Sequence, residues 1–278
     1  MVPQPIRVAV IGHVEWVTHT RGMPPGRGLI ADVTDPLVEA AGGGGVAAAA
    51  AARLGARCTL ITAFGDDHAA VSARATLMAH GVDVRGAHRT GAQTPVLTIT
   101  EPDGERTITV VGPRLQPARA DDLGWADLAH VEAVYYTGED PGTLAAGRAA
   151  PVLVVTGRRV GDLLAAGVRA DVIVASAHDP DEDLGVLPVP LRPHAVILTD
   201  GARGGVILRQ GAEPLRYPPA AAPGSVIDTY GCGDSFAAGL TVGLGQGLPI
   251  EAAVAMGARA GAACATWRGG LGPIGLIG

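Results

Sequence analysis

Short apolar runs alternate with helix-like segments along most of this 278-residue chain, and no other feature limits its fold as strongly. We expect buried strands at 6–11, 58–63, 131–136, 151–155, 171–175 and 195–199. The expected helices are 46–54, 67–80, 232–245 and 250–266. Strands and helices that alternate in this way are typical of a parallel sheet with helices packed on its faces. The sequence therefore predicts an α/β fold.

One segment breaks the alternation. Residues 94–111 consist of two alternating strands around Pro102-Asp103-Gly104, which is ordinary turn chemistry for a hairpin. A lone hairpin is at best marginally stable. We therefore expect it to pair with strands from the otherwise irregular residues 13–36 and form a small second sheet. A further hairpin is expected at 205–217. Because the chain has neither an internal repeat nor a linker, residues 1–278 are interpreted as one domain.

Composition and charge exclude several classes of protein. The net charge of −6 lacks the basic excess that a nucleic-acid backbone requires. No segment approaches the roughly 18 apolar residues that cross a bilayer, and no secretory signal is visible. The cysteines Cys58, Cys232 and Cys264 form no CxxC pair, which favours a reducing compartment. We expect a cytoplasmic protein with no nucleic-acid or membrane partner.

The chain contains no lysine, so every basic side chain is an arginine or a histidine. Any phosphate group that it binds must be held by arginine, by backbone N–H groups or through a metal ion.

Residues 227–240 carry the chemistry. A β-like run meets Gly231 and Gly233, and a helix of small residues follows. The glycines let successive N–H groups converge on one point, and a helix N-terminus favours an anion. A carboxylate there, Asp234, could accept a proton from a hydroxyl that attacks a bound phosphate. The glycine spacing alone fits an ordinary strand–helix junction with a capping Asp equally well.

The longer string decides between these readings. Asp228, Thr229, Gly231, Gly233 and Asp234 form D-T-x-G-x-G-D, which closely resembles the signature of the ribokinase-like (PfkB) carbohydrate kinases. The resemblance covers nearly the whole chain. Other segments that are similar to family motifs are Gly42-Gly43-Gly44, Phe64-Gly65-Asp66-Asp67 and Thr199-Asp200-Gly201-Ala202-Arg203-Gly204.

The resemblance implies a three-layer Rossmann-like sandwich with a small β-sheet lid, from about 13–36 and 94–111, over the acceptor. It implies ATP, Mg²⁺ and in some members a monovalent cation, and a homodimer formed through the lid. Asp234 would be the base. The implied anion hole is Gly231, Cys232 and Gly233, and the implied nucleotide site is Thr199, Gly201, Gly204, Asp228 and Thr229. Gly42 and Gly43 would lie at the substrate.

Two hydrogen-bonding positions of the family have become apolar here. An Asp after the first strand matches Val17, and an Asn in the first glycine motif matches Val46. A site with apolar groups at these positions selects different acceptors, so ribose is not the expected substrate. Replacement polar groups could come from His13, Glu15 and Asp32, and Glu139 lines up with an acidic family position near the sugar.

The family's N-x-x-E motif, which organises magnesium, matches Ser176-Ala177-His178-Asp179 and retains only its last carboxylate. Mg²⁺ keeps most of its waters, so Asp179 could suffice as the metal residue. The alternative is that Asp179 belongs to a solvated acidic run.

The leading hypothesis is an ATP-dependent kinase for a hydroxyl of a sugar or sugar-like small molecule. One alternative is a nucleoside kinase of the same fold, in which Val17 and Val46 beside Trp16 would hold a flat base. Another is a ligand-binding homologue that has lost turnover, because fold alone does not prove activity.

Overall fold

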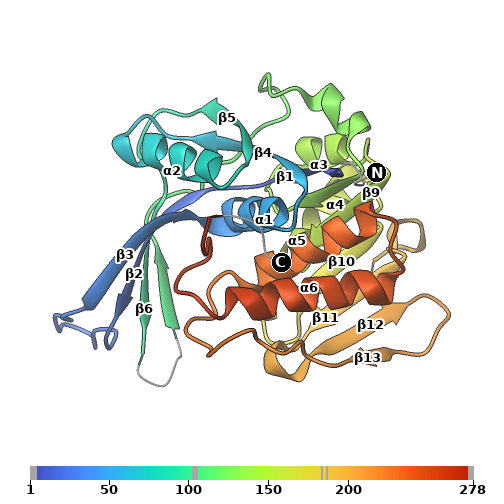
Figure 1. Ribbon diagram of the computed structural model, residues 1–278. Helices are drawn as coiled ribbons and strands as arrows, with labels where there is room; N and C mark the ends of the chain where they lie inside the picture. Colours follow the sequence, from blue (N-terminus) through green and yellow to red (C-terminus); the bar gives the residue numbers. More distant parts are fainter. Residues whose placement is uncertain (1–4, 102–105, 183, 186, 275–278) are drawn as a thin grey trace.

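The computed structural model describes residues 5–101, 106–182, 184–185 and 187–274. Its ribbon separates into a large sheet covered by helices and a small sheet that projects from one side (Figure 1). The expected turn at Pro102-Asp103-Gly104 lies outside the described residues.

The large sheet has nine strands. Their order is β13 (Leu215–Tyr217), β12 (Gly205–Arg209), β11 (Ala195–Thr199), β10 (Val172–Ser176), β9 (Val152–Thr156), β8 (Ala133–Tyr136), β1 (Arg7–Ile11), β4 (Arg57–Phe64) and β5 (Asp83–His88). From β11 to β5 all neighbours are parallel, and β12 and β13 form the expected antiparallel hairpin. The loops after the parallel strands therefore meet at one edge of the sheet, which is where ligands bind in open α/β folds.

Helices cover both faces of this sheet, because its strands are apolar on both sides. In β1, Val8 and Val10 belong to one core cluster, and Ala9 and Ile11 belong to the other. The first face is covered by α1 (Gly42–Arg53), α2 (His68–Ala79), α5 (Cys232–Gly245) and α6 (Ile250–Cys264). The second face is covered by α3 (Pro141–Gly147) and α4 (Val160–Ala166). The predicted three-layer α/β sandwich is confirmed (Figure 1).

The small sheet has the order β3 (Thr34–Ala41), β2 (Glu15–Arg21), β6 (Pro95–Thr100) and β7 (Arg106–Val110), and we call it the lid sheet. The hairpin β6–β7 was predicted correctly. The expected pairing of this hairpin with a strand from residues 13–36 is confirmed, because β2 pairs in parallel with β6 and antiparallel with β3. Residues 13–36 are therefore less irregular than expected. Moreover, β3 continues past residue 36 and leads directly into α1.

Some elements differ from the sequence prediction for identifiable reasons. Helix α1 begins at Gly42 rather than at 46, so its first turn consists of glycines. A Cβ on Gly44 would lie 2.8 Å from both Gly12 C and His13 O, which leaves no room for a side chain there. The glycines therefore allow the first turn of the helix to touch the loop after β1. Strand β5 was missed because its sequence DVRGAH lacks an apolar alternation, and α3 and α4 were missed because each has only seven residues.

Candidate active site

The N-terminus of α5 forms the centre of the site. Its N-cap Gly231 adopts φ 75°, and a Cβ there would lie 2.9 Å from Gly270 Cα and 3.0 Å from Val46 Cγ1. Glycine is therefore required on both conformational and steric grounds. Gly233 is exposed, and a Cβ on it would meet no atom within 4 Å among the described residues. The first turn of α5 therefore begins at the surface beside Gly233, and the N–H groups of a first helical turn suit an anion.

A groove of about 320 Å³ leads away from this helix end. Much of its lining is small and apolar. The lining residues are Thr199, Gly201, Ala202, Gly204, Tyr217, Pro219, Ala220, Ala222, Val226, Thr229, Cys232, Gly233, Phe236, Ala258, Gly261, Ala262 and Ala265. The groove therefore brings together the expected nucleotide-loop residues Thr199, Gly201 and Gly204 with two residues of the expected anion hole, Cys232 and Gly233.

Asp228 plays a different part from its neighbours in the motif. Its buried carboxylate accepts hydrogen bonds from Tyr230 N at 2.9 Å and from Gly269 N at 3.1 Å, and it does not line the groove. It fixes the turn before α5 and anchors the loop after α6. Thr229, in contrast, lines the groove, and its hydroxyl accepts a hydrogen bond from Arg106 of the lid sheet.

Asp234 is the third residue of α5 and is half-buried. A Cβ on Gly43 would lie 3.2 Å from Asp234 Oδ1 and 2.9 Å from Thr137 Oγ1, so these groups meet at the sheet edge. Burial first, and then the charges of Glu182 and Glu15, raise the pKa of Asp234 to about 7, although the charge of Arg158 opposes them. A carboxylate with a pKa near neutrality can both accept and release a proton.

His13 and Glu15 lie on the acceptor side of Asp234, beside the first glycines. His13 Nε2 accepts a hydrogen bond from Gly43 N at 3.4 Å and lies 3.6 Å from Glu15 Oε1. Glu15 Oε1 also accepts a hydrogen bond from Arg114 Nε at 2.7 Å. A Cβ on Gly42 would meet His13 Cδ2 at 3.0 Å. The predicted substrate residues His13, Glu15, Gly42 and Gly43 are therefore close neighbours.

The electrostatics of His13 favour a neutral ring. Burial lowers the pKa of His13 to about 3, and the nearby charge of Arg114 lowers it as well. Its Nδ1 atom is buried and makes no hydrogen bond of good geometry within the part of the chain that the structure describes. Burial also raises the pKa of Glu15. A neutral imidazole has one nitrogen that donates and one that accepts a hydrogen bond, so His13 is a polar group without charge beside Gly43.

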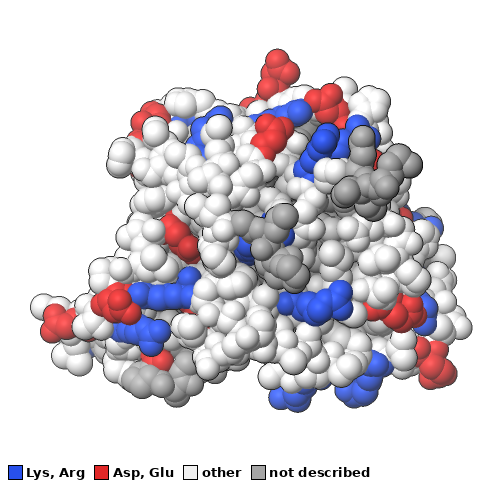
Figure 2. All heavy atoms as spheres, viewed as in Figure 1, with Lys and Arg blue, Asp and Glu red and all other residues white. Residues whose placement is uncertain are grey.

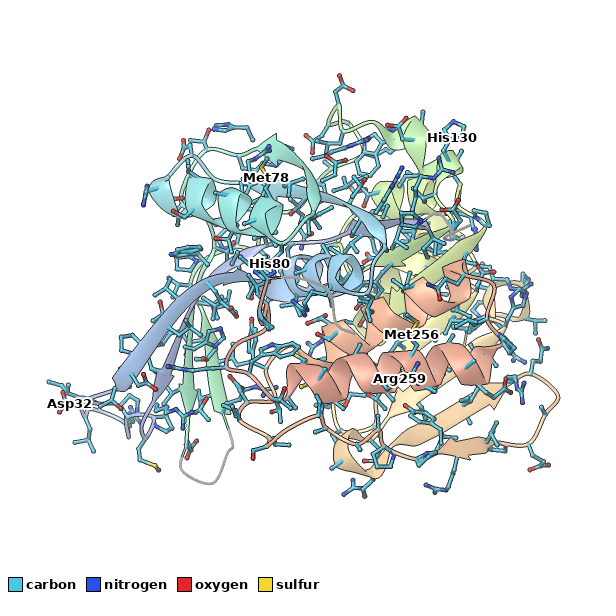
Figure 3. All side chains as sticks on the ribbon, viewed as in Figure 1. Asp32, Met78, His80, His130, Met256 and Arg259 are labelled. Carbon is cyan, nitrogen blue, oxygen red and sulfur yellow. The ribbon has the colours of Figure 1, made fainter. Side chains whose placement is uncertain are left out.

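Two other predicted polar groups lie farther out. Glu139 is exposed at the rim and accepts a hydrogen bond from Arg159 Nη2 at 2.6 Å. Asp32 is exposed at the tip of the lid sheet and points away from the body of the molecule (Figure 3). Glu139 can therefore reach only the outer end of an acceptor, and the geometry does not favour Asp32 as a replacement sugar contact.

Val17 and Val46 are fully buried and form a small cluster with Ala41, Val96 and Tyr230. Trp16 points to the opposite face of β2, as successive residues of a strand do, and packs against the main core. The expected arrangement with Trp16 beside Val17 is therefore not found.

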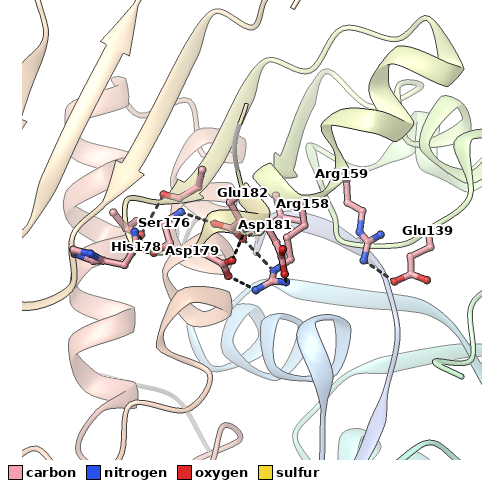
Figure 4. Close-up of polar contacts among 11 residues, drawn as sticks. Glu139, Arg158, Arg159, Ser176, His178, Asp179, Asp181 and Glu182 are labelled. Atoms are coloured by element: carbon pink, nitrogen blue, oxygen red, sulfur yellow. Dashed lines mark hydrogen bonds and ion pairs between the residues drawn. The ribbon is translucent and has the colours of Figure 1, made fainter. Parts of the chain in front are cut away.

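An acidic segment follows β10, and Arg158 contacts it from the loop after β9 (Figure 4). Asp179, the predicted metal residue, forms an ion pair with Arg158. Glu182 accepts hydrogen bonds from Thr156 Oγ1 at 3.2 Å and from Ser176 N. Burial raises the pKa of Glu182, and its charge acts on Asp234.

Within the described residues, no group of three or more His, Cys, Asp or Glu side chains could hold a metal ion by itself. Mg²⁺ that arrives with nucleotide phosphates needs only one or two carboxylates. Asp179 and Glu182 present hard oxygen donors of this kind, so the residues fit that ion.

Cys232 is the first residue of α5 and belongs to the expected anion hole. A hydrogen bond with Cys264 and burial raise the pKa of the Cys232 thiol. A raised pKa disfavours the thiolate, so Cys232 is not a reactive nucleophile.

Sequence reasoning missed four site residues, Arg114, Thr137, Arg158 and Glu182. Thr137 and Arg158 follow β8 and β9 directly, so the rule that loops after parallel strands share one edge could have identified them. Glu182 was hidden in an acidic run that resembles solvated surface. Arg114 follows the lid hairpin in the sequence and had no local signal.

The face in Figure 2 shows arginines and carboxylates interspersed on a mostly uncharged surface. Among the described residues, no helix combines the length and the hydrophobicity that a membrane span requires.

Comparison with known proteins identifies the family. The profile of the pfkB family carbohydrate kinases matches residues 6–155 and 175–274. The acarbose 7(IV)-phosphotransferase of Actinoplanes sp. is 29% identical over 228 residues, which cover 77% of this chain and 76% of that protein.

Solved structures share the fold. The ribokinase of Arabidopsis thaliana, complexed with ribose and ATP, has a TM-score of 0.77 at 18% identity, covering 98% of this chain and 96% of that chain. The adenosine kinase of Sinorhizobium meliloti has a TM-score of 0.76 at 18% identity, covering 97% and 96%. The chain belongs to the pfkB family of carbohydrate kinases and is an ATP-dependent kinase of sugar-like compounds.

Proposed function

We propose that the protein transfers the γ-phosphoryl group of ATP to a hydroxyl of an uncharged, sugar-like molecule, with Asp234 as the general base. One observation carries the proposal: a half-buried carboxylate with a pKa of about 7 lies in the first turn of α5, next to the exposed Gly233. A base beside an anion-binding helix end is the arrangement that phosphoryl transfer to a hydroxyl requires.

The groove supports a specific orientation of ATP. Its end at Gly233 offers free N–H groups and suits the phosphates. Farther along α6, Ala258, Gly261 and Ala262 provide a small-residue wall that suits a flat purine ring. The expected loop residues Thr199, Gly201 and Gly204 lie on the opposite side.

The chain's own residues act by positioning and electrostatics. The amides at 231–233 hold the transferring phosphoryl group, and Asp234 accepts the proton of the attacking hydroxyl. Asp179 and Glu182 would hold Mg²⁺ together with the nucleotide phosphates. The ion would supply positive charge that offsets the negative charge of the phosphate oxygens.

The acceptor side favours a sugar-like compound over a nucleoside. His13 is neutral and the carboxylate of Glu15 lies beside it, so hydroxyl groups would find polar partners there. A base would lack the expected aromatic platform, because Trp16 faces the main core. The similarity of this chain to an acarbose 7(IV)-phosphotransferase also supports a sugar-like acceptor.

The test is release of ADP from ATP and Mg²⁺ across a panel of monosaccharides, oligosaccharides, aminosugars, polyols and nucleosides. We expect sugar-like compounds to stimulate release and nucleosides to have little effect. Stimulation by nucleosides alone would replace the acceptor assignment with the nucleoside kinase alternative. Binding of ATP without release for any acceptor would indicate a homologue that binds but does not turn over.

The pH dependence of kcat/KM should report the ionisation of Asp234 in the free enzyme. A base must be deprotonated, and its pKa is about 7, so kcat/KM should rise with pH through a single ionisation near 7. The measurement is kcat/KM for the best acceptor between pH 5 and 9 at constant ionic strength. A profile that is flat across pH 6 to 8 would contradict the role of Asp234.

A further inference from the structure

Arg158 occupies an unusual position at the sheet edge. Its guanidinium contacts three carboxylates of one short segment: Asp179 Oδ2, Asp181 Oδ2 at 3.4 Å and Glu182 Oε1 at 3.5 Å. Figure 4 shows this side chain directed to the acidic segment, whereas the adjacent Arg159 is directed to Glu139. The Arg158 side chain is 46% exposed. It is therefore held by its ion pairs and is not enclosed by packing.

A row of neighbouring side chains lies between this cluster and the base. The buried Tyr135 hydroxyl is close enough to the side chains of Thr137 and Thr156 that they lower its pKa, although burial raises it more. Thr137 lies beside Gly43, where it meets Asp234, and Thr156 donates a hydrogen bond to Glu182. The charge of Arg158 is also close enough to lower the pKa of Asp234. Arg158 thus follows the end of β9, which is the strand next to β8 in the sheet.

Phosphoryl transfer needs a cation at this place. Negative charge spreads over the oxygens of the transferring group, and backbone amides supply only partial charges. Because the chain has no lysine, a side-chain cation must be an arginine or a histidine. Arginine's planar fork of donors matches two phosphate oxygens at once.

We propose that Arg158 leaves its carboxylate partners when ATP binds and donates hydrogen bonds to the γ-phosphate. The inference rests on the proposed function and adds a catalytic residue to it. Solvent-exposed ion pairs contribute little to stability, and the Asp181 side chain is 78% exposed. Arg158 can therefore exchange Asp181 for a phosphate group at little cost and return to it afterwards. The released carboxylates remain available to a hydrated Mg²⁺ ion. ADP lacks the γ-phosphate and does not recruit Arg158.

The competing explanation is that Arg158 only holds the acidic segment in place. Binding affinities for ATP and ADP separate the two, and no acceptor is needed. We would measure both affinities by titration calorimetry with Mg²⁺ for the wild type, Arg158→Gln and the matched control Arg159→Gln. Arg159 belongs to the same loop, but its partner is Glu139.

The expected result is a loss of about 10- to 100-fold in ATP affinity for Arg158→Gln, with ADP affinity unchanged within about twofold. Arg159→Gln should keep both affinities. An equal loss for ATP and ADP, or no loss for either, would overturn the inference. If the wild type binds neither nucleotide, the proposed function itself fails, and that outcome is distinct.

A second variant guards against a simple folding defect. Asp181→Asn removes the most exposed competing carboxylate and keeps Arg158. If Arg158 moves to the γ-phosphate, ATP affinity should stay the same or increase, because one competitor is gone. A decrease in ATP affinity for Asp181→Asn would instead show that an intact acidic cluster is what matters, and would count against the proposal.

Discussion

Replacing Asp234 by Asn is expected to lower kcat by about 10³- to 10⁴-fold while ATP affinity stays within a few-fold of wild type. Asn keeps the size and the hydrogen-bonding oxygen of the side chain but cannot accept the proton of an attacking hydroxyl. The phosphate-binding amides of α5 belong to the backbone and are unaffected. The measurement pairs initial rates of ADP release with calorimetric binding of ATP. Turnover that survives the substitution would contradict the assignment.

The stability of the same variant provides a control. The native pKa of Asp234, about 7, lies above the ordinary value of 3.8 for an unfolded chain. The ionised carboxylate therefore destabilises the fold progressively as pH rises from about 4 to 7, and the full cost is present at pH 8. Asp234→Asn should consequently stabilise the protein by about 1–3 kcal/mol at pH 8 and by much less at pH 5. Denaturant unfolding at both pH values checks this, and destabilisation at pH 8 would show that Asp234 is not under electrostatic strain.

Gly231→Ala should cause the second large effect. Gly231 has φ 75°, and the new Cβ would meet Gly270 Cα at 2.9 Å and Val46 Cγ1 at 3.0 Å. The backbone at Gly270 can move only at a large energetic cost, so we expect a loss of about 2–4 kcal/mol in the free energy of unfolding. ATP binding should fall as well, because the first turn of α5 must move.

Gly233→Ala is the matched control for this substitution. Its Cβ would meet no atom within 4 Å in the described part of the chain, and Gly233 lies inside α5. The fold should keep its stability, yet ATP affinity should fall at least about tenfold because the methyl group takes up space that a phosphate needs. Unfolding curves and ATP titrations of both variants test the pair. Equal stability of the two variants would contradict the packing argument, and unchanged ATP affinity of Gly233→Ala would place the phosphates elsewhere.

The main sheet could be predicted because its strands are buried on both faces and read as continuous apolar runs. The lid sheet could be predicted only in part. The hairpin at 94–111 has clear alternation, whereas β2 carries Glu15, Thr18 and His19 within its seven residues. Strand β2 is stabilised by its pairing with β3 and β6, and its own sequence has no clear strand pattern.

The candidate site also has a part that could be predicted from the sequence and a part that could not. The motif from Asp228 to Asp234 is local, so the start of a helix directly after its glycines could be predicted from the sequence alone. The cluster of Arg158 and Glu182 depends on the parallel pairing of β9 and β10, which brings the ends of the two strands together although α4 separates them in the sequence. Local pattern also placed Trp16 beside Val17, whereas strand pleating sends them to opposite faces.

In the proposed mechanism, main-chain amides at the start of α5 hold the transferable phosphate. NMR of the ¹⁵N-labelled protein with Mg²⁺ tests this directly, by titration with ATP and, separately, with AMP. The amide resonances of Cys232, Gly233 and Asp234 should shift strongly with ATP and much less with AMP, which carries no β- or γ-phosphate. Resonances that respond equally to both nucleotides, or that stay fixed while those of another region shift, would contradict the account.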